Sequence, residues 1–569
     1  MEFFQVMSSH HWAAVACAFA MLSSGKAQQS FDFSTLQLPQ RLGIDATERI
    51  PLTLSEAVAK VLENNKEIAA ARLDVARSDL NYSLEAAAYD AKFHLEAYTE
   101  RRVTPVSSIL GGAANGKLTE SDTELAPKYD GLLPWGGGSY TLDMSATRQG
   151  SDNFYVPLGP QYPTQAGVSL VQPLMRGLHI DERRWRIEVA RKNRTLSDDQ
   201  LQQKVVDVVA AVERNYWDLV AAYTTLQIHT EAKALSKQLL DANQRQMELG
   251  QRSPIDVVEA RRQLEAAEEN YDDDVQSVTR AENALKTMMA DGLQSPLWTQ
   301  TLAPSAGGQE PERLARMTRP VNALIETALG NRPEFKQNDT EREINEADAR
   351  YYRDRLKPQV DLEASYRTQG LSGQIAVRPP NPLLNTDLNT RVNQLSALAG
   401  LAALPATDAF SVPGLFIGGI GQSGLNLLAE RFPTVRAGVR IELPLHNHAA
   451  EAQVALAAND SQRIRNRREQ LQLRIAAEVR DAAQAIRTAQ ARVDRAAAVR
   501  ASAAELFESE KRKFQDGLST VFLVLQRQNT LLDAQSSEAQ ARTEVYRRLA
   551  EAERATGTSL DAHGISIRH

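Results

Sequence analysis

Cysteine is almost missing from this 569-residue chain, since Cys17 is the only one. A single cysteine excludes an intrachain disulfide framework and a cysteine-based metal site. A dense basic run is missing too: 65 lysine and arginine residues stand against 72 aspartate and glutamate residues, a net charge of −7. Because nucleic-acid binding requires a concentrated positive surface, we expect no nucleic-acid partner.

The chain also lacks any stretch that approaches the roughly 20 apolar residues of a membrane-spanning helix. If it enters a membrane, it must do so as β-strands. The first 27 residues favour an export signal, because the short apolar stretch Ala13–Leu22 precedes a small-x-small cleavage site at Gly25–Ala27. The match is incomplete, since no lysine or arginine precedes the apolar stretch. Cys17 is either an inert signal-peptide residue or a lipid attachment site.

What the chain does contain is an internal repeat. AGVSLVQPL at Ala166–Leu174 returns as AGVRIELPL at Ala437–Leu445, and a shift of 267 residues aligns Leu62–Ile68 with Leu329–Phe335. This pattern predicts a tandem duplication in a chain too long for one ordinary core. The predicted parts are a signal peptide (1–27), an N-terminal segment (28–50), repeat 1 (51–300), a linker (301–320), repeat 2 (321–556) and a C-terminal tail (557–569).

Glycine and proline, which break helices, are absent from two long runs and two shorter ones. The long runs are Leu178–Leu249 (72 residues) and His446–Asp516 (71 residues), and the shorter ones are Ile255–Asp291 (37 residues) and Leu518–Thr556 (39 residues). A helix of the longer kind extends roughly 100 Å. We therefore expect each long helix to pack lengthwise against the shorter one that folds back on it.

Heptad spacing of apolar residues predicts the packing faces of the long helices. Any long alanine-rich helix shows some heptads by chance, but two matched pairs of runs make chance a poor explanation. One seam consists of Ile475, Val479, Ala482, Ile486, Ala489, Val493 and Ala496, and the other of Val205, Val208, Val212, Leu219, Ala222 and Leu226.

Between the helices, alternating apolar and polar residues predict strands with one apolar face. Four main strands are expected, around Phe93–Ala97, Val168–Leu170, Val360–Ala364 and Val439–Leu443. Proline cannot donate to a strand ladder, so Pro173 and Pro444 are expected to mark strand-to-helix junctions, with a long helix directly afterwards.

Two segments have no counterpart in the other repeat. Leu133–Ala146 contains PWGGG followed by alternating apolar residues, and it is interpreted as an extra hairpin strand. Ile375–Glu430 is long and contains the apolar stretch Leu395–Leu404. It is an external loop, a plug in a lumen or a lipid-facing element, and the sequence does not choose among these.

Four strands cannot close a membrane barrel, for which about eight is the smallest number that works. The strands must therefore be pooled between chains. Three chains would supply about twelve strands and about twelve long helices.

Several motifs, in order and at matching spacing, resemble those of TolC-like outer membrane efflux proteins. The resemblance covers nearly the whole mature chain, Pro51–Thr556. The motifs are LTLSEAVAKVLENNKEI (Leu52–Ile68), GVSLVQPLMRG (Gly167–Gly177), VERNYWDLVAA (Val212–Ala222), GQRSPIDVVEA (Gly250–Ala260), Asn331–Glu334, FPTVRAGVRIELPLHNHAA (Phe432–Ala450) and GLSTVFLVLQRQNTLLDAQ (Gly517–Gln535).

The resemblance implies an α+β membrane protein. Three identical chains would form a twelve-stranded outer membrane barrel, continued by a coiled-coil α-helical tunnel in the periplasm. It implies a channel of a tripartite efflux pump or type I secretion system, with outer membrane lipid, a periplasmic adaptor and an inner membrane transporter as partners. Such a channel performs no chemistry and needs no cofactor.

The turns between the paired helices form the inner mouth of the tunnel in this family. By resemblance, candidate aperture residues are Arg252, Asp256, Glu259 and Asp516, which would otherwise be solvated charges near helix ends. Candidate adaptor-docking residues are Gly250, Ser253, Gly517, Leu518 and Thr520, which would otherwise serve only the turns.

The second turn departs from the family pattern. Leu523 and Gln526 occupy positions where acidic constriction residues are expected, Ser519 stands in place of a linking arginine, and Phe514 in place of a tyrosine. This substitution pattern indicates a looser or more apolar mouth.

The remaining polar clusters favour ordinary roles. Asp272–Asp274 is interpreted as a solvated face rather than a lumen lining. His446 and His448 lack a nearby third ligand, so turn residues are favoured over a metal site. Rival hypotheses are a non-conducting envelope spacer, which would not need the alternating strands, and a periplasmic adaptor, which usually has one helical hairpin. No motif supports an enzyme.

Overall fold

The computed structural model describes residues 31–33, 39, 41–113, 115–250, 253–306, 310–377, 386–404, 411–516 and 518–566. The expected export signal with Cys17, and the site candidates Arg252 and Gly517, lie outside the described residues. The chain forms two compact units, described here separately. The helical unit comprises Met1–Ala76, Leu196–Asp339 and Asn466–His569, and the sheet unit comprises Arg77–Thr195 and Thr340–Arg465. The predicted α+β class is confirmed, whereas the tandem boundaries along the sequence stay a prediction.

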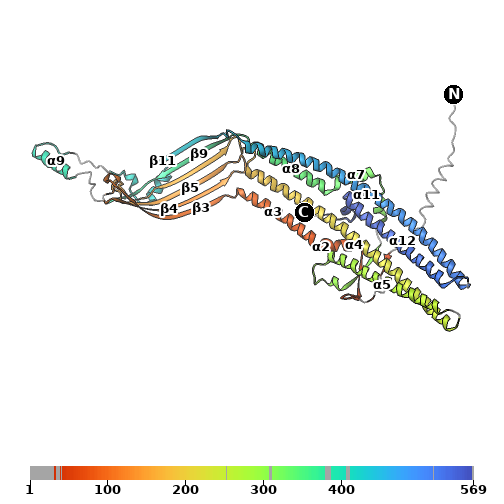
Figure 1. Ribbon diagram of the computed structural model, residues 1–569. Helices are drawn as coiled ribbons and strands as arrows, with labels where there is room; N and C mark the ends of the chain where they lie inside the picture. The colour runs from red at the N-terminus through yellow and green to blue at the C-terminus, as the bar shows by residue number, and fades with distance from the viewer. Residues whose placement is uncertain are drawn as a thin grey trace, which may run out of the picture. The chain divides into compact units, whose positions relative to one another are not determined.

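The sheet unit is built on one antiparallel sheet, seen as the bundle of arrows in Figure 1. Its six long strands lie in the order β3-β4-β5-β7-β9-β11. The short strand β6 pairs with β5, and the short strand β10 pairs with β6. The strands are β3 (Lys92–Pro105), β4 (Lys117–Leu132), β5 (Ser139–Ser151), β6 (Leu158–Gln161), β7 (Thr164–Pro173), β9 (Gln359–Gly370), β10 (Gly373–Ile375) and β11 (Phe432–Glu442).

The prediction of about four strands per chain is wrong, because the sheet has six long ones. The four predicted strands are present as β3, β7, β9 and β11, and the extra strand expected near Leu133–Ala146 is β5. The strand β4 was missed because acidic residues and Pro127 hide its alternation. Proline cannot donate to a ladder, and the pairing of β4 with β5 skips from Leu125 to Lys128.

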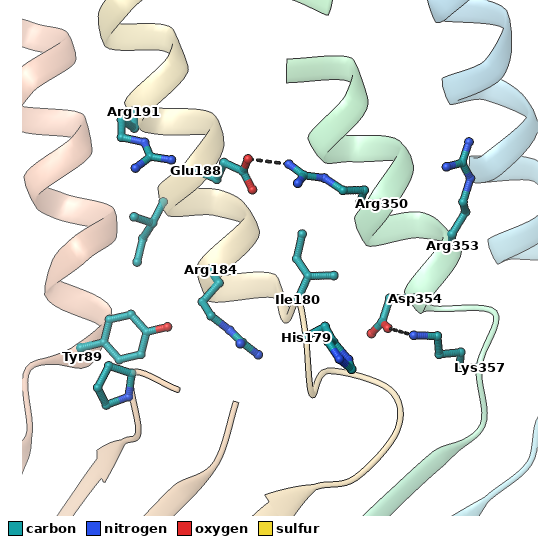
Figure 2. A pocket seen from close by; sticks show the side chains of 12 residues that line it. Tyr89, His179, Ile180, Arg184, Glu188, Arg191, Arg350, Arg353, Asp354 and Lys357 are labelled. Carbon is teal, nitrogen blue, oxygen red and sulfur yellow. Dashed lines mark hydrogen bonds and ion pairs between the residues drawn. The ribbon is translucent and has the colours of Figure 1, made fainter. Parts of the chain in front are cut away.

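The strand-to-helix junctions occur where proline predicted them. Pro173 is the last residue of β7, and β11 ends two residues before Pro444. The following helices α4 (Glu182–Glu248) and α11 (His448–Gln515) begin several residues later rather than directly afterwards. At this end of the sheet, a short turn of helix at Tyr89, the start of α4 and the end of α8 (Pro333–Asp354) surround a pocket (Figure 2).

Part of the segment Ile375–Glu430 packs against the opposite end of the sheet. It contains α9 (Thr386–Leu398), a 3-10 turn (Gly414–Phe416) and α10 (Ile420–Leu428). The hydroxyls of Ser423 in α10 and Thr164 in β7 lie 2.9 Å apart. Asn426 donates to the carbonyl oxygens of Leu371 and Leu415. These contacts fix α10 on the sheet, and the three interpretations of the whole segment stay open.

Long helices dominate the helical unit, and the four predicted glycine- and proline-free runs are confirmed as helices (Figure 1). The helices α3, α4, α8 and α11 contribute residues to both units. The remaining bounds are α2 (Leu54–Asn64), α3 (Lys66–Ala86), α5 (Pro254–Met289), α6 (Glu310–Met317), α7 (Val321–Asn331), α12 (Val521–Thr556) and α13 (Ser559–Ala562). A small sheet of β1 (Phe31–Asp32), β8 (Gln300–Ala306) and β2 (Asp45–Leu52) joins them in the order β1-β8-β2.

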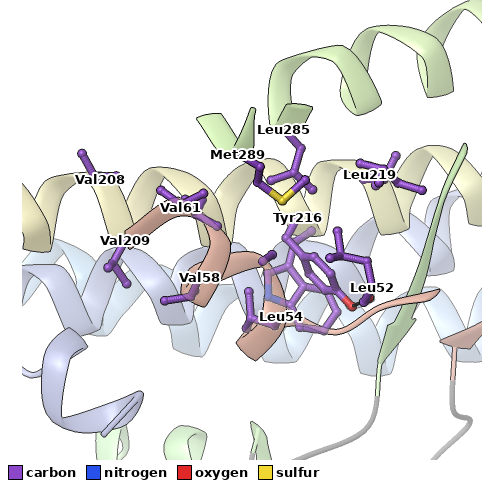
Figure 3. Packing of buried hydrophobic residues seen from close by; sticks show 14 of the residues in the cluster. Leu52, Leu54, Val58, Val61, Val208, Val209, Tyr216, Leu219, Leu285 and Met289 are labelled. Carbon is purple, nitrogen blue, oxygen red and sulfur yellow. Dashed lines mark hydrogen bonds between the residues drawn. The ribbon is translucent and has the colours of Figure 1, made fainter. Parts of the chain in front are cut away.

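The first predicted seam lies entirely in one core of the helical unit, and the second predicted seam contributes Ile475, Val479, Ala482 and Ile486 to another core. In the first core, the α4 residues Val208, Tyr216 and Leu219 pack against α2 and against Leu285 and Met289 of α5 (Figure 3). In the second core, Ile475, Val479 and Ile486 of α11 pack with residues of α12 and α7. Each Å² of apolar surface that these seams bury stabilises the lengthwise pairing by roughly 25 cal/mol.

Two clusters of buried charge lie within these cores. Arg313 of α6 forms ion pairs with Glu213 of α4 and Glu553 of α12, and all three side chains are at most 6% exposed. Arg41 pairs with Glu282, which also pairs with the fully buried Lys286. Buried charges persist only when paired, so each cluster fixes the registry of the elements that supply it.

No helix in the described part of the chain combines the length and apolar character needed to cross a membrane.

Candidate functional site

The sheet has one apolar face, most of which no described residue of the chain covers. A single register row crosses all six long strands through Phe93, Tyr129, Leu142, Val168, Tyr366 and Val435. Each of these side chains is exposed, from 37% for Tyr366 to 74% for Val435. A contiguous apolar surface of this extent requires an apolar environment.

The opposite face of the same sheet is polar. The neighbouring register row runs through His94, Lys128, Asp143, Gly167, Arg367 and Thr434. Arg367 reaches to within 3.6 Å of Asp143 across β7. A Cβ at Gly167 would lie about 3.1 Å from Asp143 and 3.3 Å from Arg367, so glycine leaves room for this pair. The sheet thus separates an apolar side from a charged side, as the wall of an aqueous pore does.

Both edges of the sheet end on long strands with only one partner. Within the described residues, β3 pairs only with β4, and β11 pairs only with β9. β3 begins after the helix α3, whereas β11 ends before the helix α11, so the two edge strands run in opposite directions. Their free backbone groups can therefore extend the sheet antiparallel with another copy of the same edges.

The first turn between paired helices lies between α4 and α5. Ser253 and Asp256 form a capping box at the start of α5, in which the backbone amide of Ser253 donates to the Asp256 carboxylate at 3.3 Å. Glu259 accepts from Arg262 one turn later, at 2.6 Å, and this bond lowers the pKa of Glu259. Gly250 has a left-handed backbone, with φ of 69°. The structure thus assigns helix-end roles to Asp256 and Glu259 in the isolated chain.

The second turn, between α11 and α12, is built in a similar way. The Thr520 hydroxyl accepts from the Leu523 amide and caps α12, and Asp516 is exposed near the end of α11. Ser519 donates to the Glu510 carboxylate, a bond that lowers the pKa of Glu510. Ser519 therefore holds α11 to the turn, a contact that sequence reasoning did not find.

Both turns carry exposed apolar side chains that sequence reasoning mostly overlooked. They are Leu249, Ile255 and Val258 at the first turn, and Leu518, Phe522 and Leu523 at the second. The sequence could have indicated them, because these apolar residues lie beside a turn and do not follow the heptad spacing of the seams. Exposed apolar clusters on a helix end are typical of surfaces that bind another protein.

Two polar contacts along the helices were not predicted. The amide groups of Gln263 in α5 and Asn529 in α12 exchange hydrogen bonds of 2.6 and 3.4 Å, and so connect the two hairpins. His229 of α4 bonds to Asp274 of α5 at 2.6 Å, and this bond raises the pKa of His229. Asp272 and Asp273 are exposed, so the predicted solvated face applies to these two and not to Asp274.

The histidine pair near Pro444 lies at the start of α11: His446 belongs to the connection from β11, and His448 is the first residue of α11. Asn447 donates to the carbonyl oxygen of Arg355 at 3.0 Å and ties the β11–α11 connection to the α8–β9 connection. His448 lies 3.3 Å from Glu451, and the rings of His446 and His448 are 5.7 Å apart. In the ranges that the structure describes, no three metal-ligating side chains gather into a group.

Comparison with known proteins agrees with this arrangement. The family described as outer membrane efflux protein matches residues 139–291 and 324–558, which is more than half of the chain. No curated protein matches the sequence. Among solved structures, the chain is similar to the CmeC outer membrane channel of Campylobacter jejuni, with 14% identity, a TM-score of 0.57 and coverage of 93% of this chain and 95% of that one.

Two further solved structures share the fold. The outer membrane protein VceC of Vibrio cholerae is 13% identical, with a TM-score of 0.56 and coverage of 89% of this chain and 96% of that one. A membrane protein from Pseudomonas aeruginosa is 15% identical, with a TM-score of 0.57 and coverage of 89% and 92%.

Proposed function

The chain belongs to the outer membrane efflux protein family, and from this premise we propose that three copies assemble into one channel through the outer membrane. The chain itself is an outer membrane efflux channel with its helical part in the periplasm, and the resemblance found in the sequence is confirmed. The members of the family are channel proteins, and we propose that this chain performs no chemistry of its own.

The single observation that supports the assembly is the two-faced sheet with open edges. In lipid, every unpaired backbone group costs several kcal/mol, so a sheet with free edges is not stable there. β11 of one copy and β3 of the next run antiparallel and can pair. Six long strands from each of three copies would give an eighteen-stranded barrel rather than the twelve strands expected from the sequence. Barrels of this size leave an aqueous channel.

The two turns are proposed to face the periplasmic partners. The exposed apolar side chains at Leu249, Ile255, Leu518 and Phe522 support docking of an adaptor, together with the predicted residues Gly250, Ser253, Gly517, Leu518 and Thr520. The adaptor would connect the channel to an inner membrane transporter of a tripartite pump. A type I secretion system is the second arrangement that the same surfaces allow.

The aperture is proposed to involve Arg252, Asp256, Glu259 and Asp516 where three copies of the turns converge. In the single chain, Glu259 is engaged by Arg262, and Asp516 is free to face other copies. Rings of charge at a narrow mouth favour counter-ions over ions of like charge. The Gln263–Asn529 contact supports a closed arrangement, because it holds the two hairpins together near the turns.

Single-channel recording in planar bilayers tests the proposal. The purified protein should conduct, and its protein mass in detergent should be three times that of the mature chain. A non-conducting spacer would give the same mass without current, and an adaptor subunit would not insert. Deletion of the gene should lower tolerance to exported toxic compounds or abolish secretion, and intact tolerance together with intact secretion would contradict an export role.

A further inference from the structure

The short helix α10 packs with its polar side inward and its apolar side outward. Ser423 and Asn426 are at most 1% exposed, whereas Ile420, Leu425 and Leu428 are 53%, 61% and 80% exposed. A helix on a protein surface in water does the reverse, because burial of apolar side chains is favourable and burial of polar ones is costly. The orientation of α10 therefore indicates that its outer surroundings are apolar.

Hydrogen bonds to the sheet unit hold the polar side of α10 inward. The Ser423 hydroxyl lies 2.9 Å from the hydroxyl of Thr164 in β7. Asn426 donates to the carbonyl oxygens of Leu371 and Leu415 at 2.9 and 2.8 Å. Buried polar groups are tolerated when they are hydrogen-bonded. A rotation of the helix that buried its outward leucines would break these bonds.

The helix α10 lies on the apolar face of the sheet. Thr164 of β7 and Gly370 of β9 are register partners, and each is an even number of residues from Val168 or Tyr366 of the apolar row. Because side chains alternate between the faces along a strand, all four positions belong to the same face. A Cβ at Gly370 would meet the carbonyl oxygen of Ser423, so α10 is in direct contact with that face.

Along the strands, α10 lies at the outer boundary of the apolar face. The register row beneath it consists of Ala97, Leu125, Ala146, Thr164 and Gly370. Two residues further from the long helices, the same face becomes polar at Thr99, Thr123 and Arg148. In a sheet that crosses a membrane, a change from apolar to polar marks the boundary between hydrocarbon and head groups.

The outward side chains of α10 complete the apolar surface where the strands do not supply it. On β4 the boundary row presents Leu125, which is 49% exposed. On β7 and β9 the same row presents Thr164 and Gly370, and α10 covers both. Ile420, Leu425 and Leu428 therefore take the place of these small residues, and the outward surface stays apolar from β4 to β9.

Charge is absent from the sequence around α10. Ser411–Ala429 contains no charged residue, although charged residues make up 24% of the chain. Charge returns at Glu430, whose carboxylate lies near the hydroxyl of Tyr366. Tyrosine is typical of the level at which hydrocarbon meets head groups. A charge-free outward surface is what contact with lipid requires, since an unpaired charge in hydrocarbon is costly.

We propose that α10 lies in the outer leaflet of the membrane, at the boundary with the head groups, where Ile420, Leu425 and Leu428 contact the acyl chains of the lipids. The α10 part of the segment Ile375–Glu430 is then a lipid-facing element rather than an external loop or a plug. Its contact with lipid fixes how deep the sheet sits in the bilayer. This inference rests on the proposed function, since it requires that the sheet cross the outer membrane.

Spin labels on single cysteines test the inference in the complete protein, reconstituted into vesicles of phosphatidylethanolamine and phosphatidylglycerol. Leu425→Cys and Leu428→Cys place a label on the outward side of α10. Val435→Cys places one on the apolar face of the sheet, and Asp272→Cys places one on an exposed face of the helical unit. Collisions are measured with oxygen, which dissolves in hydrocarbon, and with a polar nickel chelate, which stays in water. The unsubstituted protein measures background labelling of Cys17, the only native cysteine.

The labels on α10 should resemble the label at Val435 rather than the label at Asp272. We expect them to collide with the nickel chelate at least about threefold less often than the label at Asp272, and with oxygen within about twofold as often as the label at Val435. Frequent collision with the chelate at both α10 positions would place the helix in water and overturn the inference. Protection from both reagents would show that protein, such as a second copy, covers α10, and would also overturn it.

The label at Val435 separates this inference from the proposed function. Frequent collision with the chelate there would refute a sheet that crosses the membrane, and the proposed channel with it. Protection of Val435 together with water-exposed labels on α10 would refute the lipid contact of α10 alone.

The variant Asn426→Leu tests whether the buried amide sets the orientation of α10. The change leaves the carbonyl oxygens of Leu371 and Leu415 without their donor, so the label at Leu428 should become at least about twofold more mobile. The matched control Gln422→Leu changes a half-buried amide on the same helix and should have a smaller effect. An unchanged label in Asn426→Leu, or an equal change in both variants, would contradict a helix fixed by its inward polar side.

Discussion

The two halves of the chain carry nearly equal helices and unequal numbers of strands. α4 and α11 have 67 and 68 residues, and α5 and α12 have 36 residues each. The first half contributes the long strands β3, β4, β5 and β7, but the second half contributes only β9 and β11. In the proposed trimer, helix turns must reach a common depth to form one mouth, which constrains helix length. Strands pair sideways, so a hairpin can be inserted without changing any other strand.

The halves also differ in how their helices are packed. The first core contains large side chains such as Tyr216, Trp217 and Tyr223, whereas the second is rich in small ones such as Ala328, Ala552 and Ala555. Small residues let helix backbones approach closely, and aromatic residues hold them further apart. The first half thus has more strands in the sheet and larger side chains in its core than the second half.

Removing the hairpin formed by β4 and β5 tests the difference between the two halves most directly. Deletion of Lys117–Ser151 would leave two long strands in each half and let β3 pair with β7. We expect a twelve-stranded barrel with a cross-section of about half the original, because barrel diameter grows roughly linearly with strand number. Electron cryomicroscopy of the trimer would count the strands. An unchanged barrel diameter would place β4 and β5 outside the wall.

The two buried ion-pair clusters differ in what they connect. Arg313 joins Glu213 of the first half to Glu553 of the second, whereas Arg41 contacts Glu282 of the first half. Arg313→Ala leaves the Glu553 carboxylate buried without its cation, while Glu213 keeps only its contact with His563 at 2.5 Å, and the change should destabilise the helical unit by about 3–5 kcal/mol. Arg41→Ala should cost less, because Lys286 still pairs with Glu282. Denaturation followed by the helical circular dichroism signal measures both. Equal losses would show that the two clusters are equivalent.

The polar contact between the hairpins offers a smaller effect. Asn529→Ala leaves the 6%-exposed Gln263 amide without its partner and should cost about 1–3 kcal/mol. Replacing both residues by alanine should cost less than the sum of the single changes. If this contact holds the mouth closed, conductance of either variant rises. Unchanged conductance would make the contact purely structural.

The stability of the first hairpin, formed by α4 and α5, should depend on pH, and that of the second hairpin, formed by α11 and α12, should not. Counted from Gly250 and Gly517, the positions of His229 and Asp274 correspond to Ala496 and Ala541 in the second half. The bond to Asp274 raises the pKa of His229 above its ordinary value of 6.5. Protonated histidine therefore stabilises the folded hairpin fully below pH 6.5, and this contribution is lost as the pH rises through the raised pKa.

Hydrogen exchange resolved by peptide measures this difference after correction for intrinsic rates. Protection of α4 and α5 around His229 should fall by a small factor between pH 6 and pH 9, while α11 and α12 should not change. The variant His229→Gln should abolish the pH dependence. A matching decline in both hairpins would assign the effect to some other group.

The parts of this molecule that were predictable follow from local rules. Helix bounds came within a few residues because glycine and proline interrupt helices wherever they occur, as at Gly250. The strand β4 was missed because most of its acidic residues lie at the end of the sheet far from the long helices. Both faces of the sheet are polar there, so the sequence of β4 shows no alternation of apolar and polar residues. Glu259 could have been assigned to Arg262 from their spacing of three residues. The pocket at the helical end of the sheet could not be predicted, because its lining residues Tyr89, Arg191 and Arg353 are far apart in the sequence and surround it only through the pairing of distant strands.

The free edges of β3 and β11 have a consequence for how the protein is made. A newly exported copy that is still alone exposes two long rows of unpaired amides and carbonyls, which pair with any extended peptide they meet. In the proposed trimer these groups are satisfied only once the copies pair with one another. Entry into the bilayer and joining of the copies are therefore expected to occur together.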